Sequence, residues 1–252
     1  MTLHHKSSGP AKAPVLLMAG SLGTNLRMWD SQLPLSERLR IVRLDHRGHG
    51  ESPTPPGPYE IADLGRDVLG LMDILEVERA SICGLSLGGM VGMWLAAHAP
   101  ERLERLILIC TAAHMPPASA WQERAAAVLA AGSTEPIADA VVDRWLTPEF
   151  AAAHAELRAD LRAMLVATRP EGYAWCCGAI ERMDLRGDLP GVRAPTLVIS
   201  GTDDLATPPE RQREISEAIP GARHEVVGPA AHVAAVEAPA AINRLIAEHL
   251  LA

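Results

Sequence analysis

Short runs of almost continuous apolar residues constrain the fold of this chain more than any other feature of its sequence. Strands covered on both faces, as in a parallel sheet, have this pattern, whereas a strand with one wet face alternates apolar and polar residues. The predicted strands are Val15–Ala19, Ile41–Leu44, Ala80–Cys83, Leu106–Cys110, Thr196–Ser200 and His224–Val227. Helical periodicity is found in Ile61–Leu75, Leu87–His98 and Ala240–Leu250. This alternation predicts an α/β fold with a doubly wound, mostly parallel sheet.

One long stretch interrupts the alternation. Between about Ala113 and about Leu189 no convincing strand is found, and the Ala-rich sequence is typical of helices. The predicted helices are Ala120–Ala131, Ile137–Trp145, Glu149–Ala167 and Glu171–Met183. A helical insertion in an α/β sheet often covers a ligand site, although such helices can also simply pad the sheet. We therefore expect an α/β core of residues 1–112 and 190–252 with a helical lid, residues 113–189, inserted in it.

The charge balance limits the classes of partner. The chain has 31 acidic and 23 basic residues, a net charge of -8. An acidic protein is a poor candidate for binding nucleic acid or an anionic membrane surface. No apolar run approaches the roughly 20 residues that cross a bilayer. We expect a small-molecule ligand, no nucleic-acid partner and no membrane span.

The N-terminus and the cysteines indicate the compartment. Met1–Gly9 has no apolar core of the kind that signal peptides carry, and we expect it to be a disordered polar leader rather than a metal site at His4-His5. No cysteine belongs to a C-x-x-C pair, so we expect reduced thiols in a cytoplasmic protein. The four cysteines are Cys83, Cys110, Cys176 and Cys177.

The segment Gly84-Leu85-Ser86-Leu87-Gly88 joins a predicted strand directly to a predicted helix. A serine on such a sharp turn is exposed, and glycines beside it leave the room that the turn requires. The N-terminus of the following helix favours negative charge at the hydroxyl. Because no Walker-type Lys or Thr follows, we predict that Ser86 is a nucleophile rather than part of a phosphate-binding turn.

A serine hydroxyl is a weak nucleophile until a base removes its proton, and in this context an acid and then a histidine follow along the chain. His232 lies after the last predicted strand, in an apolar loop, and is the best placed of ten histidines. After Thr196–Ser200 two carboxylates are adjacent. We assign Asp204 as the acid and keep Asp203 as the alternative.

An oxyanion hole needs two N–H donors. We assign the first to Leu87, the residue after the nucleophile. The second is expected from the loop that follows the first predicted strand, Ala19-Gly20-Ser21-Leu22-Gly23. We assign it to Ser21, with Leu22 as the alternative.

The order of elbow, helical insertion, acid and histidine resembles the α/β-hydrolase superfamily over essentially the whole chain. The segment Asp45-His46-Arg47-Gly48-His49-Gly50-Glu51-Ser52 is similar to the D-x-R-G-x-G-x-S segment of that superfamily. The resemblance implies an α/β-hydrolase fold and a structural role for His46 and His49. Ala19 is a departure, since many members have His there.

Within the superfamily the sequence resembles 3-oxoadipate enol-lactonases. The similar stretches are Gly20-Ser21-Leu22-Gly23-Thr24, Met28-Trp29, Gly57-Pro58-Tyr59, Asp67-Val68-Leu69-Gly70-Leu71-Met72-Asp73, Cys83-Gly84-Leu85-Ser86, Glu171-Gly172-Tyr173, Ala179-Ile180-Glu181, Asp184-Leu185-Arg186, Ile199-Ser200-Gly201-Thr202 and Asp204-Leu205. The resemblance implies hydrolysis of an enol-lactone to 3-oxoadipate, in bacterial degradation of protocatechuate and catechol, with water and no cofactor or metal.

The substrate of that family carries a carboxylate, which calls for a cation. Arg144 is the candidate, with Trp145 as an apolar wall, although an Arg on the surface of an amphipathic helix fits the pattern equally well. Other serine hydrolases share the triad, including carboxylesterases, C–C bond hydrolases and perhydrolases. A ligand receptor with little turnover is a further alternative. The oligomeric state is not predicted.

Overall fold

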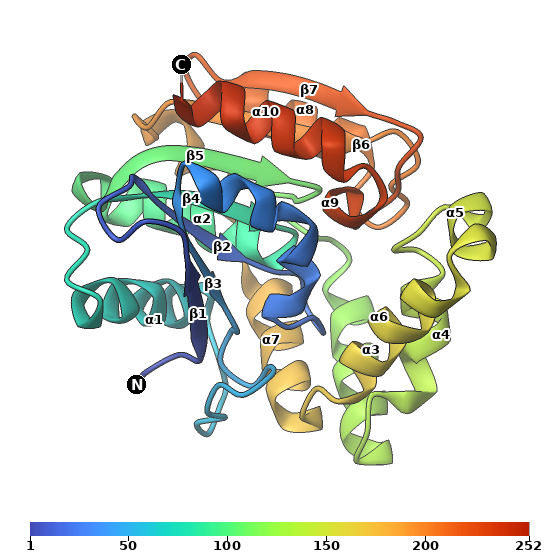
Figure 1. Ribbon diagram of the computed structural model, residues 1–252. Helices are drawn as coiled ribbons and strands as arrows, with labels where there is room; N and C mark the ends of the chain where they lie inside the picture. Colours follow the sequence, from blue (N-terminus) through green and yellow to red (C-terminus); the bar gives the residue numbers. More distant parts are fainter. Residues whose placement is uncertain (252) are drawn as a thin grey trace.

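The computed structural model describes residues 1–251 and contains one seven-stranded sheet in the order β1-β3-β2-β4-β5-β6-β7 (Figure 1). All neighbouring strands are parallel except β1 and β3. The predicted doubly wound, mostly parallel α/β fold is therefore confirmed. The strands are β1 (His5–Ser8), β2 (Val15–Ala19), β3 (Arg40–Leu44), β4 (Ala80–Leu85), β5 (Leu103–Ile109), β6 (Thr196–Gly201) and β7 (Arg223–Val227).

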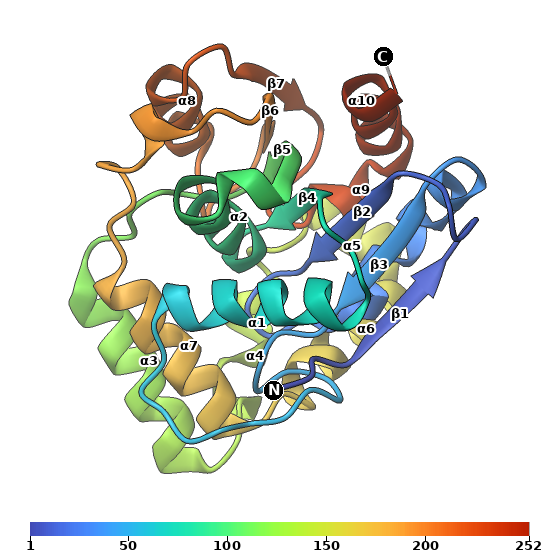
Figure 2. The same cartoon turned by 90° about the vertical axis from the view of Figure 1, so that its left-hand side faces the viewer.

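Helices cover both faces of the sheet (Figure 2). One side carries α1 (Ile61–Ile74), α2 (Leu87–His98) and α8 (Pro209–Ala218). On the other side the 3-10 helix η1 (Leu26–Glu37), α9 (Ala234–Glu237) and α10 (Pro239–Leu251) contact one another. Short 3-10 turns η2 (Pro100–Arg102) and η4 (Leu189–Gly191) complete the core. Within residues 1–251, no helix is long and apolar enough to cross a membrane.

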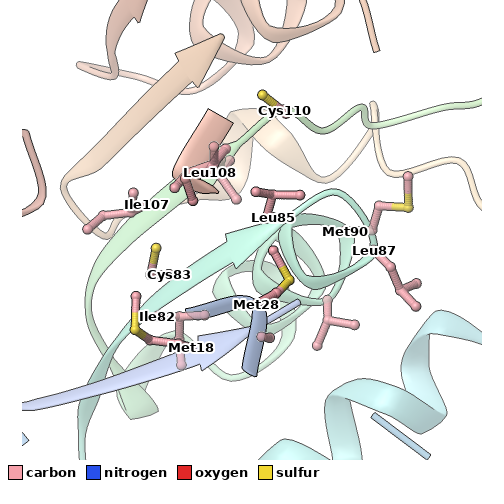
Figure 3. Packing of buried hydrophobic residues seen from close by; sticks show 14 of the residues in the cluster. Met18, Met28, Ile82, Cys83, Leu85, Leu87, Met90, Ile107, Leu108 and Cys110 are labelled. Carbon is pink, nitrogen blue, oxygen red and sulfur yellow. The ribbon is translucent and has the colours of Figure 1, made fainter. Parts of the chain in front are cut away.

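The central strand β4 is buried along its whole length. Figure 3 shows Met18, Ile82, Cys83, Ile107 and Leu108 packed together, each at most 1% exposed. Full burial of an aliphatic side chain stabilises a fold by about 1.5–3 kcal/mol. This packing fixes the carboxyl end of β4, where Ser86 follows.

The chain between β5 and β6 is helical, and residues 110–195 pair as sheet only in an isolated bridge between His114 and Asp184. Its helices α3 to α6 gather on the side toward which β5 and β7 point (Figure 1), and α7 packs against α3. They are α3 (Ala118–Ala131), η3 (Glu135–Ile137), α4 (Ala138–Val142), α5 (Pro148–Ala153), α6 (Ala155–Val166) and α7 (Pro170–Arg182).

Two helices of this insertion differ from the prediction. The single helix expected over Glu149–Ala167 is wrong, because the chain breaks at His154, whose φ of -128° and ψ of 53° are not helical. The helix expected over Ile137–Trp145 ends at Val142.

The insertion contacts the core backbone through a pair of glycines. A Cβ built on Gly48 would lie 2.5 Å from the Cα of Gly172, in α7, and a Cβ on Gly172 would lie 2.5 Å from the Cα of Gly48. Distances this short leave no space for a side chain at either position. The docking of α7 therefore depends on glycine at both places.

The expectation of a disordered N-terminal leader is wrong. Residues His5–Ser8 form β1, which pairs antiparallel with β3. The His4 Nδ1 lies 2.7 Å from Oδ2 of Asp45, and the His4 N–H donates to the Ser52 hydroxyl. Asp45 is buried and also accepts from the N–H groups of Leu26 and Glu51. The polar leader thus supplies one partner of a buried carboxylate.

We expect His4→Ala to lower the free energy of unfolding by about 1 kcal/mol, because a hydrogen bond to the buried Asp45 carboxylate is lost. Urea denaturation measures the change. The matched control is Lys6→Ala, which alters an exposed residue of β1, the strand that directly follows His4. Equal stability of the two variants would contradict the assigned role of His4.

Candidate active site

Ser86 occupies the sharp turn between β4 and α2. Its φ of 55° and ψ of -113° lie outside the regions that L-residues ordinarily adopt. The surrounding chain holds this geometry: the Ser86 N–H donates to the Ile109 carbonyl at 3.0 Å, and the Thr111 hydroxyl donates to the Ser86 carbonyl at 2.7 Å. The turn therefore presents Ser86 in a strained, fixed position, as the sequence predicts.

Glycine is required on both sides of this turn. A Cβ on Gly84 would lie 2.2 Å from the Gly88 carbonyl oxygen, and one on Gly88 would lie 2.0 Å from the Ala19 carbonyl oxygen. Figure 3 shows the apolar side chains Leu85, Leu87 and Met90 around the same bend. The pattern G-x-S-x-G is thus dictated by close backbone approach.

His232 and Asp204 meet between the loops that follow β7 and β6. The His232 Nδ1 lies 3.0 Å from Oδ2 and 3.1 Å from Oδ1 of Asp204, and both side chains are buried. With the proton on Nδ1 directed at the carboxylate, Nε2 keeps a free lone pair and can act as a base.

Asp204 is fixed by several donors. It accepts from the N–H groups of Ala206 and Thr207 and from the Thr207 hydroxyl, at 2.7–2.9 Å. Burial raises the pKa of Asp204, but the charge of His232 and the hydrogen bonds from His232 and Thr207 outweigh burial and lower it. The carboxylate therefore stays ionised beside His232. Asp203 instead accepts from the neighbouring Thr202 hydroxyl, so the geometry selects Asp204 over the alternative.

The loop after β2 carries both N–H groups that were considered for the second oxyanion donor, those of Ser21 and Leu22. The Ser21 N–H donates to Sδ of Met28 at 3.4 Å, and the Gly23 N–H donates to Nε2 of His49 at 2.9 Å. Within residues 1–251 the Leu22 and Leu87 N–H groups have no acceptor. The Met28 thioether is only a weak acceptor for the Ser21 N–H, so the assignment of Ser21 with Leu87 as oxyanion donors, and of Leu22 as the alternative to Ser21, stays a prediction.

A tight turn explains this arrangement. The Thr24 N–H donates to the Ser21 carbonyl at 3.1 Å, and Gly23 has a φ of 83°, which are features of a type II turn. Burial lowers the pKa of His49, so its imidazole is neutral and can accept the Gly23 N–H. The histidine of the D-x-R-G-x-G-x-S segment thus braces the loop, in keeping with the structural role expected of it.

Ser86 and His232 line one cavity of about 70 Å³ together with Ser21 and Leu22. The rest of its wall comes mainly from the helical insertion. These residues are Met115, Trp121, Arg124, Val141, Arg144, Trp145, Tyr173 and Ile180. The structure thus brings Arg144 and Trp145 to the same cavity as the predicted nucleophile and base.

Two arginines line this cavity without an ion-pair partner among the described residues. Within residues 1–251, neither Arg124 nor Arg144 has a carboxylate within salt-bridge distance, although Arg124 lies over the Trp121 ring at 4.9 Å. Burial and the charge of Arg124 lower the pKa of Arg144. Arg124 was not predicted from the sequence. Its i,i+3 spacing from Trp121 on a helix is the signal that could have indicated it.

Comparison with known proteins agrees with this geometry. The sequence model of the alpha/beta hydrolase fold family matches residues 14–239. The chain is 40% identical to 3-oxoadipate enol-lactonase 2 of Acinetobacter baylyi, over 98% of this chain and 92% of that protein. The crystal structure of the enol-lactonase from Burkholderia xenovorans LB400 superposes with a TM-score of 0.97 at 42% identity, covering 99% of this chain and 96% of that one.

A putative carbamate hydrolase, RutD of Caulobacter, is 30% identical over 98% of this chain and 94% of that protein. The resemblance to enol-lactonases inferred from the sequence is confirmed by the first two relatives. The third shows that related chains carry a different assigned substrate.

We expect Ser86→Gly to be more stable than Ser86→Ala by roughly 1 kcal/mol, because glycine adopts the positive φ without strain whereas alanine keeps the Cβ. Thermal or urea unfolding of the two inactive variants measures the difference. If Ser86→Ala proves equally stable, the backbone of the turn is not strained.

Proposed function

The chain is an enzyme of the α/β hydrolase fold family, and from that premise we propose that it opens 3-oxoadipate enol-lactone to 3-oxoadipate with water. The observation that carries the proposal is the cavity itself, whose wall holds Ser86, His232 and two arginines that have no carboxylate within salt-bridge distance among residues 1–251. A small ester with a carboxylate fits both features. The enol-lactonase relatives support the same substrate.

The proposed reaction begins when Ser86 Oγ attacks the lactone carbonyl while His232 takes the hydroxyl proton. The developing oxyanion accepts from the N–H group of Leu87 and from that of Ser21 or Leu22. The ring C–O bond then breaks, and the ring oxygen becomes an enolate that stays attached to the acyl chain on Ser86. An enolate is a good leaving group, so it needs little assistance from an acid.

Water completes the cycle. His232 returns the first proton to the enolate and then removes one from water, which attacks the acyl carbon. The Ser86 ester bond breaks, the proton on His232 passes to Oγ, and 3-oxoadipate leaves as its enol, which becomes the ketone. Asp204 holds the imidazole tautomer and stabilises the imidazolium throughout.

Arg144, together with Arg124, binds the substrate carboxylate in this proposal. Each charged hydrogen bond of this kind contributes about 1.5–3 kcal/mol. Trp145, at 3% exposure, forms an apolar wall for the ring. Residues 113–189 act as the lid, since most of the cavity wall belongs to them.

The same proposal places the enzyme in the β-ketoadipate pathway of protocatechuate and catechol degradation. Its four cysteines are all unpaired thiols, which supports a reducing compartment, the cytoplasm.

We expect kcat/KM for the enol-lactone to reach about 10⁴–10⁸ M⁻¹s⁻¹, as for a true substrate, and to exceed that for a neutral p-nitrophenyl ester. Initial rates measure both, with Ser86→Ala as the blank. A faster ester or a faster carbamate would overturn the choice of substrate. Full activity of Ser86→Ala would overturn the mechanism.

We expect Arg144→Ala and Arg124→Ala each to reduce kcat/KM for the anionic lactone by about 10- to 100-fold, since each removes a charged contact. The neutral ester is expected to lose much less. Arg162→Ala is the matched control, because Arg162 lies in the insertion but pairs with Glu135 and Asp139 away from the cavity. Equal losses on both substrates would remove the arginine concerned from carboxylate binding.

A further inference from the structure

Glu237, in α9, lies between the insertion and the loop that carries His232. Its Oε1 accepts from the N–H of Thr147 at 2.9 Å and from the Thr147 hydroxyl at 2.8 Å. Its Oε2 accepts from the N–H of Ala231 at 2.5 Å. Both carboxylate oxygens are therefore used, one on the insertion and one on the residue directly before His232.

A second contact joins the same two segments on the other side of His232. The Val233 N–H donates to the Trp145 carbonyl at 3.0 Å. The backbone N–H groups that flank His232 are thus both tied to residues 145–147, one directly and one through Glu237. Arg144 and Trp145, which line the cavity, belong to the same short segment.

The main chain around His232 has further contacts: the Ala230 carbonyl accepts from the Asp203 N–H at 2.9 Å, and the Val233 carbonyl accepts from the N–H groups of Val236 and Glu237. The hydrogen bonds of the His232 imidazole are made by Nδ1, to Asp204 and at 3.3 Å to the Thr207 hydroxyl. These bonds orient the ring about its Nδ1 side but do not fix the main chain from which it projects. The distance over which a base takes a proton is short, so a shift of the main chain of even 1 Å is costly.

We propose that Glu237 is a positioning residue that holds His232 in register with the segment Trp145–Thr147. This inference rests on the proposed role of His232 as the base. The Glu237 carboxylate accepts hydrogen bonds from three donors and has no donor of its own. We call the contacts of Glu237 with Thr147 and Ala231 the clamp. The clamp joins the cavity wall at Arg144 and Trp145 to the main chain that carries the base.

The charge of the clamp residue suits its partners. A carboxylate accepts on both oxygens, whereas a glutamine amide accepts on one and donates from the other. In Glu237→Gln the NH₂ group must face either the Ala231 N–H or the Thr147 donors. One side of the clamp is then lost while the size of the side chain is retained.

We expect Glu237→Gln to lower kcat by about tenfold or more with KM changed less than twofold, since the defect lies in proton transfer rather than in binding. Thr147→Val removes the hydroxyl at nearly constant volume and is expected to lower kcat by a smaller factor. Thr147→Ser keeps the hydroxyl and is the matched control, with kcat close to that of the unaltered enzyme. The double variant Glu237→Gln/Thr147→Val is expected to lose less than the product of the single losses, because both break the same clamp.

The experiment does not depend on the substrate. The second-order rate constant for labelling of Ser86 by a fluorophosphonate reports the nucleophile and its base even if the enol-lactone is not hydrolysed. A lower labelling rate in Glu237→Gln, with an unchanged unfolding temperature and with Thr147→Ser unaffected, supports the proposal.

Two outcomes overturn it. One is an unaltered labelling rate and unaltered kcat in Glu237→Gln. The other is a labelling rate of Glu237→Gln that falls only in proportion to a loss of folded protein, with Thr147→Val showing the same proportional loss. Failure of the enol-lactone as a substrate combined with a slower labelling of Glu237→Gln would reject the proposed function and leave the clamp standing.

Discussion

The strained backbone of Ser86 is the constraint on which the rest of the site depends. A positive φ at a residue with a side chain costs free energy and persists only where the surroundings enforce it. Here β5 supplies the acceptor for the Ser86 N–H, and Thr111 donates to its carbonyl. The fully buried β4 provides the rigid base for the turn. The packing of the hydrophobic core thus holds the Ser86 hydroxyl group in its position.

The cavity has a local charge opposite to that of the whole chain. The protein carries a net charge of -8, yet the cavity wall holds Arg124 and Arg144, which form no ion pair with any carboxylate in the described part of the chain. Half-burial of a guanidinium is unfavourable unless something compensates, and an anionic ligand is the natural compensation. The net charge of the chain therefore does not indicate the charge of the cavity.

The buried central strands were predicted well from the sequence, whereas several helices and the polar edge strand β1 were not. Strands β2, β4 and β6 are covered on both faces, so their apolar runs stand out. The edge strand β1 has the sequence HKSS and joins the sheet through backbone pairing, which leaves no apolar signal. Helix α8 was not predicted because only Gln212 and Ile215 of it are buried.

The same division holds within the site. Ser86 and His232 were placed by local context, because turn chemistry is encoded within a few residues. The Gly23 N–H in the loop after β2 is bound by His49, which is 26 positions away, and no local pattern encodes that contact. Arg124 was not predicted because the sequence does not show which helix of the insertion lines the cavity. Long-range packing decides both.

The contact between Gly48 and Gly172 bears on how the two parts of such a protein could be exchanged. Where a helix docks through side chains, a foreign helix can repack by changing rotamers, but main chain against main chain allows no such adjustment. A helical insertion grafted from another hydrolase would need a glycine at the position of Gly172, and the core that receives it would need a glycine at the position of Gly48. The pair thus sets a rule of compatibility for chimaeras, independent of whichever substrate the grafted insertion prefers.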